Sequence, residues 1–166
     1  LHLSLFAQRI AVISSASAAG YGDFCNQLHG NEYGFGFQTE LFGAIMQGEQ
    51  VEQSIVAALN EINEREDEFD CVVIRGGGAT ADLSGFDTLV LAENVANFPL
   101  PIITGIGHER DESILDMVAH TRVKTPTAAA AFLIDHLDIT LHRIEQAQTS
   151  IQHIVEHTIQ HEKLHL

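Results

Sequence analysis

Two segments of this chain share one pattern, a short β-branched run followed by glycine and then by ionisable side chains. Residues 72–74 lead into Arg75 and three glycines, and residues 102–106 lead into the Gly-His-Glu-Arg-Asp sequence of residues 107–111. Such runs are typical of buried parallel strands. Open parallel sheets bind ligands outside the carboxyl ends of their strands, where loops and helix N-termini converge. The pattern therefore predicts an α/β fold with a site where these two strands end.

Strand and helix signals alternate along the first part of the chain. The expected strands are residues 9–15, 34–43, 71–74 and 102–106, and the expected helices are residues 23–28, 51–62, 84–97 and 113–119. This order favours a mainly parallel open sheet of about four strands, with right-handed crossovers and helices on both faces. It also puts Asp23 near a helix N-terminus.

A long helix is expected after Thr125, because a threonine suits the N-cap and Pro126 suits the first helical position. Its apolar residues recur at intervals of three, four or seven, a spacing typical of coiled coils; they are Leu137, Leu141, Ile144, Ile151 and Val155. A four-stranded domain cannot bury so long a stripe. We therefore expect an α/β domain over residues 1–126, the start of a truncated helical region over residues 127–166, and a chain that is a fragment of a larger protein.

Charge and cysteine content exclude some functional classes. The chain has 8 Lys and Arg against 23 Asp and Glu, a formal net charge of −15, which argues against binding nucleic acid or an anionic membrane without another domain. No apolar run reaches the ~20 residues needed to cross a bilayer, so no membrane partner is expected. Cys25 and Cys71 are interpreted as reduced thiols, which indicates a cytoplasmic protein.

The three glycines that follow the expected strand at residues 71–74 suit an anion. Without Cβ atoms, such a stretch can expose several backbone N–H groups, and Arg75 adds a planar guanidinium that can bind two phosphate oxygens. We therefore predict that Gly76, Gly77 and Gly78 bind phosphate together with Ser15, at the end of the first strand. The stretch matches neither the dinucleotide fingerprint nor a P-loop. A tight turn beside a salt-bridged arginine is the structural alternative.

His108 is the candidate for acid–base or nucleophilic chemistry. It follows a strand in a glycine-flanked loop, and imidazole titrates near neutral pH. Asp111, three residues later, is suited to orient it. Asp23 is by default a helix cap, as are Asp82 and Asp87 for the helix that follows them. A cluster of Asp23, His108 and Asp111, with or without Asp82, would instead suit a hard divalent cation, so the residues leave a metal undecided.

Taken in order, five segments resemble the catalytic domain of the exonuclease VII large subunit. The resemblance runs from about Arg9 to Leu137, and the ordered set is specific although each segment alone is weak. The segments are residues 11–15 with 19–20 and Asp23, residues 47–48 leading into 55–59, residues 75–78 with 82, 83 and 86, residues 107–111 with Asp116, and residues 125–130.

The resemblance implies exonucleolytic hydrolysis of phosphodiester bonds in single-stranded DNA, from both ends, to short oligonucleotides. Carried over by motif, the family's functional residues fall on Asp23, Arg75, His108 and Asp111. The resemblance also implies two partners, a small helical subunit and an N-terminal OB-fold domain before Leu1 that supplies the positive, stacking surface for single strands. It does not commit the chain to a metal, and Mg²⁺ is a candidate only.

A rival interpretation comes from a different functional class. The same glycines and His108 would serve a non-catalytic α/β module that recognises a phosphate or nucleotide and uses its helical tail for assembly. Turnover distinguishes the two, because a binding module holds its ligand without releasing products.

Overall fold

The computed structural model describes residues 1–17, 19–76, 83–106 and 112–164 of the chain. Its described strands form one parallel sheet in the order β2-β1-β3-β4-β5. The strands are β1 (Arg9–Ser14), β2 (Gln38–Gly43), β3 (Cys71–Arg75), β4 (Ile102–Gly105) and β5 (Thr121–Arg122). The predicted parallel sheet is confirmed, and β5 adds a strand to the expected four. With two residues, β5 is too short to produce a periodic signal in the sequence.

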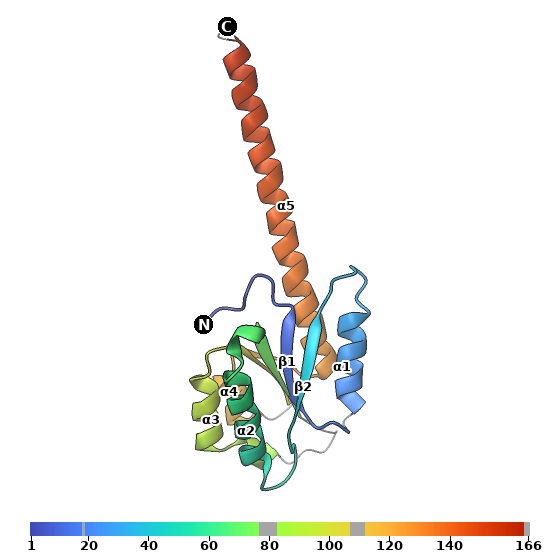
Figure 1. Ribbon diagram of the computed structural model, residues 1–166, viewed down its shortest axis with the longest axis vertical. Helices are drawn as coiled ribbons and strands as arrows, with labels where there is room; N and C mark the ends of the chain where they lie inside the picture. Colours follow the sequence, from blue (N-terminus) through green and yellow to red (C-terminus); the bar gives the residue numbers. More distant parts are fainter. Residues whose placement is uncertain (18, 77–82, 107–111, 165–166) are drawn as a thin grey trace.

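Helices cover both faces of the sheet, as predicted (Figure 1). Helices α1 (Ala19–His29) and α5 (Pro126–Leu164) lie on one face. The other face carries α2 (Val51–Asn63), α3 (Leu89–Ala96) and α4 (Ile114–Val118). Two short 3-10 helices, η1 (Glu66–Glu68) and η2 (Leu83–Phe86), join these elements.

Alternation along the central strands divides the core into two clusters, which explains why their sequences are continuously apolar. Ile13 and Ile74 point to the face that α2 covers, whereas Val12 and Val73 point to the face of α1 and α5. Arg75 lies two residues after Val73, so its side chain is directed to the α1 face.

Helix α1 begins earlier than the sequence predicted, and this changes the role of Asp23. The helix starts at Ala19, so Asp23 lies a turn inside it, and the first turn contains no acidic residue. The interpretation of Asp23 as a cap is therefore wrong. The small residues before it indicated a loop from local propensity, but Gly20 is buried against Arg75 of β3, and this packing favours a helix.

Strand β2 is shorter than the predicted extended segment because Asn31 organises a turn before it. The Asn31 carboxamide accepts hydrogen bonds from the N–H groups of Tyr33 and Phe35 and donates to the carbonyls of Leu28 and Phe35. Gly34 within this turn has a φ of 70°, a conformation that favours glycine. The chain becomes extended only at Gln38.

Asp87 does not cap α3, in contrast to the prediction. Thr88 is the N-cap, and its hydroxyl accepts a hydrogen bond from the N–H of Leu91 at 3.3 Å. Asp87 instead accepts a hydrogen bond from the backbone N–H of Ile114. Asp82, the other acid interpreted as a cap, lies outside the described residues.

The long helix α5 belongs to the core only in its first half. Thr125 caps it, as predicted, and accepts a hydrogen bond from the N–H of Ala128. Its side chains are buried as far as Thr140, whereas those of Ile144, Ile151 and Val155 are 39%, 61% and 49% exposed. Figure 1 shows this second half extending beyond the sheet at the end where β1 begins.

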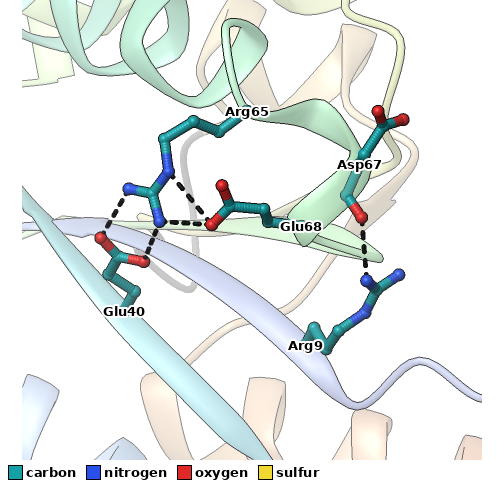
Figure 2. A network of polar contacts seen from close by, with 5 residues as sticks. All are labelled: Arg9, Glu40, Arg65, Asp67 and Glu68. Atoms are coloured by element: carbon teal, nitrogen blue, oxygen red, sulfur yellow. Dashed lines mark hydrogen bonds and ion pairs between the residues drawn. The ribbon is translucent and has the colours of Figure 1, made fainter.

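Arg65 ties β2 to the segment that follows α2 (Figure 2). Its guanidinium donates to both carboxylate oxygens of Glu40 and to Glu68, and it lies over the rings of Phe42 and Phe69. Hydrogen bonds to the two carboxylates raise the pKa of Arg65. All three charged side chains are well exposed, so this network contributes little to stability and mainly orients the connection.

Asp70, by contrast, is a half-buried acid that should make stability depend on pH. Burial alone would raise its pKa, but hydrogen bonds from the Arg9 side chain and from the N–H groups of Arg9 and Gln8 outweigh burial and lower it. A lowered pKa in the folded state stabilises the fold above the unfolded-state pKa of about 3.9. This contribution is lost as pH falls through the lower, folded-state value.

We expect Asp70→Asn to lower the free energy of unfolding by about 1 to 2 kcal/mol at pH 7, and by less at pH 3, where Asp70 is partly protonated. Urea unfolding at both pH values measures the difference. Asp67→Asn is the matched control, because Asp67 contacts Arg9 through its backbone carbonyl (Figure 2). An equal loss at both pH values for Asp70→Asn would contradict the assignment.

Candidate active site at the carboxyl edge of the sheet

Arg75 ends β3, and its guanidinium lies against the first turn of α1. A Cβ atom on Gly20 would be 2.1 Å from Nη2, 2.3 Å from Cζ and 2.6 Å from Nε of Arg75. Only a residue without a side chain leaves room for the guanidinium in this position. This role of Gly20 could not be predicted from the sequence, because the contact joins residues far apart in the chain.

Arg75 brings a positive charge to this edge, and no ion pair with a described residue neutralises that charge. Its Nε and Nη1 atoms are buried and have no hydrogen-bond partner among the described residues. Burial lowers the pKa of Arg75, and the negative charge of Asp23 offsets part of this effect. An arginine nevertheless stays protonated in proteins. The salt-bridged turn considered as a structural alternative is therefore not what the described residues form, because none of them makes an ion pair with Arg75.

The N-terminus of α1 adds to this positive environment. The first N–H groups of a helix have no partner within the helix and carry partial positive charge. Arg75 lies directly against Gly20 in that first turn. Unpaired guanidinium donors and helix N–H groups at one point are complementary to an anion with several oxygens, of which phosphate is the common biological example.

Ser14 ends β1 beside Arg75, and Ser15 follows it. Ile13 pairs with Ile74, so Ser14 is level with Arg75 on the neighbouring strand and lies on the same face. The Ser14 hydroxyl is buried and has no partner among the described residues. Ser15, the predicted phosphate ligand, is half-buried, and its hydroxyl is 3.1 Å from that of Ser17. A polar residue that ends an apolar strand was the signal that would have found Ser14.

Of the predicted phosphate-binding glycines, Gly76 is described and is buried. A Cβ atom on Gly76 would be 3.1 Å from Cγ2 and 3.2 Å from Cα and the carbonyl oxygen of Ile106. This close approach brings the ends of β3 and β4 together. Gly77 and Gly78 lie outside the described residues.

Two of the four predicted catalytic residues, Asp23 and Arg75, belong to the described part of the chain. Arg75 lies at the carboxyl edge, where burial lowers its pKa and the negative charge of Asp23, exposed on α1, raises it. His108 and Asp111 lie outside the described residues. Their segment follows Ile106, which contacts Gly76 next to Arg75.

Neither a metal cluster nor a membrane-spanning helix is present among the described residues. No three His, Cys, Asp or Glu side chains in this part of the chain gather closely enough to hold a metal ion. Across the same residues, no helix is both long and apolar enough to span a membrane.

Comparisons with known proteins identify the family. The family model described as exonuclease VII, large subunit, matches residues 1–166. The exodeoxyribonuclease 7 large subunit of Lactobacillus delbrueckii subsp. bulgaricus is 37% identical over 150 residues, which are 90% of this chain and 32% of that protein. The protein of the same name from Cyanothece sp. is 36% identical over 168 residues, covering 96% of this chain and 39% of the relative.

Among solved structures, a 3-dehydroquinate dehydratase-like protein from Bifidobacterium longum covers 80% of this chain and 97% of its own at 13% identity, with a TM-score of 0.45. That likeness is too low to carry an argument. The chain spans about a third of the length of the curated relatives that it matches. On the full-length match of the family model and the identity to these relatives, the chain belongs to the exonuclease VII large-subunit family.

Proposed function

We propose that this chain carries the centre that hydrolyses phosphodiester bonds in an exodeoxyribonuclease acting on single-stranded DNA. The observation that carries the proposal is the guanidinium of Arg75, which lies against Gly20 at the start of α1 and has two buried nitrogens without a partner among the described residues. Membership of the exonuclease VII large-subunit family supports the same conclusion. The proposed products are short oligonucleotides released from both ends of the strand.

In the proposed mechanism, the protein neutralises the scissile phosphate with fixed donors. Arg75, the N–H groups at the start of α1 and those of Gly76, Gly77 and Gly78 contact the phosphate oxygens, and Ser15 adds a hydroxyl at the same edge. A preorganised donor of this kind supplies ~3 kcal/mol in the transition state. Negative charge develops on these oxygens as the new bond to phosphorus forms, so the donors act where they are most effective.

The proton transfers are assigned to His108. Oriented by Asp111, it either takes the proton from attacking water and returns it to the leaving oxygen, or attacks phosphorus itself. In the first route, water forms a new P–O bond as the bond to the leaving oxygen breaks. In the second, the leaving oxygen takes a proton from solvent, and water then hydrolyses the P–N bond and frees His108. Asp23 positions the water or His108. Asp23, whose negative charge raises the pKa of Arg75, is the proposed ligand if Mg²⁺ is used, although no step requires a metal.

The substrate and partners follow from the parts of the molecule that this chain does not span. A net charge of −15 does not favour binding of a polyanion, so we assign the binding of single-stranded DNA to an OB-fold domain of the full-length protein. We assign the exposed apolar side chains of α5 to helical contacts with the small subunit. The division at residues 126 and 127 into an α/β domain and a helical region is part of this proposal.

The cytoplasm is the proposed compartment. Cys25 and Cys71 are both free thiols, and Cys71 is fully buried in the core. Cytoplasmic conditions keep such thiols reduced.

The test of the proposed function is digestion of end-labelled single-stranded DNA by the full-length protein with its small subunit, with and without EDTA. We expect short oligonucleotides from strands labelled at either end, and little cleavage of a blunt duplex. Cleavage in the presence of EDTA would show that the reaction does not need Mg²⁺. Loss of cleavage in EDTA would assign a metal to the site. Saturable binding without product would support the non-catalytic phosphate module and overturn the proposal.

The two glycines of α1 offer a matched pair of substitutions. A side chain at Gly20 occupies the place of the Arg75 guanidinium, whereas a Cβ atom on Gly22 would meet nothing within 4 Å. We expect Gly20→Leu in the full-length enzyme to lower the cleavage rate about tenfold or more, since a misplaced donor loses most of its effect. Gly22→Leu should retain activity and stabilise α1 by roughly 0.5–1 kcal/mol.

Cleavage assays and thermal melting of both variants provide the comparison. Gly20→Leu should remain folded, because the atoms it displaces belong to the flexible end of a long side chain. Equal activity of the two variants would show that the position of Arg75 against α1 is irrelevant to catalysis.

A further inference from the structure

Asp87 links two connections at the carboxyl edge of the sheet that are far apart in the sequence. Its Oδ1 atom accepts a hydrogen bond of 2.7 Å from the backbone N–H of Ile114. Asp87 directly follows η2, on the connection from β3 to α3, whereas Ile114 begins α4, on the connection from β4 to β5. The two residues are 27 positions apart in the chain.

The start of α4 is itself held firmly. The backbone N–H and the hydroxyl of Ser113 both donate to Oδ2 of Asp116, at 3.1 and 2.8 Å, and the N–H of Asp116 donates to the Ser113 hydroxyl at 3.1 Å. Ser113 is fully buried, and Asp116 is 6% exposed. This reciprocal capping box fixes the backbone at the point where Asp87 attaches.

A second contact joins the same two connections where they leave the sheet. Gly76 follows β3 and lies against Ile106, which follows β4. A Cβ atom added to Gly76 would be 3.2 Å from the backbone of Ile106. The connections are therefore tied where they begin, by Gly76 and Ile106, and tied again further on, by Asp87 and Ile114. His108 and Asp111 lie in the chain between Ile106 and Ile114.

We propose that Asp87 is a positioning residue that holds the start of α4 in register with the connection that follows Arg75, and that cleavage depends on this register. The inference rests on the proposed function. Catalysis requires the proton-transferring group and the phosphate donors to be aligned, and a misplacement of 1 Å costs about a hundredfold in rate. The Asp87 hydrogen bond is the described polar contact that crosses from one connection to the other.

The geometry assigns this role to the acceptor oxygen of Asp87 and not to its charge. Asp87 is exposed and makes no ion pair among the described residues. The N–H of Ile114 is one of the first donors of a helix, which water can satisfy if the side chain is removed. Loss of Asp87 should therefore change alignment more than it changes stability.

The test compares Asp87→Ala, Asp87→Asn and Thr88→Ala in the full-length enzyme with its small subunit. Asp87→Ala should lower kcat about tenfold or more, with KM within about twofold and Tm within a few degrees. Asp87→Asn should restore kcat to within about threefold, because the amide oxygen accepts the same bond. Thr88→Ala removes the neighbouring hydroxyl that caps α3, so it should lower Tm and leave kcat of the folded enzyme unchanged.

Three results would overturn the inference while the wild-type enzyme cleaves DNA. They are an unchanged kcat in Asp87→Ala, a loss in Asp87→Asn as large as in Asp87→Ala, and a loss of kcat in Thr88→Ala equal to that in Asp87→Ala. An inactive wild-type enzyme overturns the proposed function and this inference together, so the two failures are distinguishable.

Discussion

Replacing Arg75 by alanine in the full-length enzyme is expected to lower the rate of single-strand cleavage by about two decades or more. The guanidinium carries a full charge, and two of its buried nitrogens have no partner in the described part of the chain, at the edge where the phosphate is proposed to lie. Removing a preorganised donor to a developing oxyanion costs about 3 kcal/mol, which corresponds to that loss of rate. Single-turnover digestion of an end-labelled strand measures the chemical step directly.

Two further substitutions at this position separate charge from geometry. Arg75→Lys keeps the charge but loses the planar fork, so it should recover only a small part of the rate. Arg75→Met keeps the apolar stem and removes a buried cation that no described residue pairs, so it should leave thermal stability unchanged or raise it. A large drop in Tm with normal activity of the folded fraction would instead make Arg75 a structural residue.

Replacing His108 by alanine is the second substitution expected to have a large effect. General acid–base catalysis contributes about 10²- to 10⁴-fold, so we expect a loss of at least two decades in the cleavage rate, with binding of single-stranded DNA retained. Asp111→Asn should lower the cleavage rate less than His108→Ala does, because the histidine remains and only its orientation is less well fixed. Cleavage and filter binding measured on the same preparations distinguish catalysis from affinity.

His29→Ala is the control for this substitution. His29 ends α1, at the opposite end of the helix from Gly20 and the Arg75 guanidinium, and its side chain is exposed. It should behave as wild type. Wild-type cleavage by His108→Ala would remove His108 from the mechanism and leave the phosphate donors as the only catalytic assignment.

The strands and the place of Arg75 at the end of one of them could be predicted from the sequence, because both are local patterns. The runs before Arg75 and before Gly107 are apolar on both faces, and this happens when helices cover both sides of a sheet. Thr125 and Pro126 marked the start of α5 through a capping preference that depends only on neighbouring residues.

The remaining features depend on contacts between distant residues. Gly20 has its role because a side chain from β3 occupies the space beside it, and local propensity cannot report that neighbour. Asp87 was expected to cap the helix next to it, but Thr88 does so, and Asp87 instead reaches a backbone N–H of α4. The strand β5 is defined only by its pairing with β4, and its two residues carry no periodicity of their own.

The most direct test of the account is the structure of the full-length enzyme bound to a short single strand whose scissile phosphate is replaced by a non-hydrolysable analogue. The account predicts an oxygen of that phosphate within hydrogen-bond distance of Nε or Nη1 of Arg75, beside the first turn of α1. A scissile phosphate bound away from the carboxyl edge, with Arg75 still against Gly20 and unpaired, would contradict it.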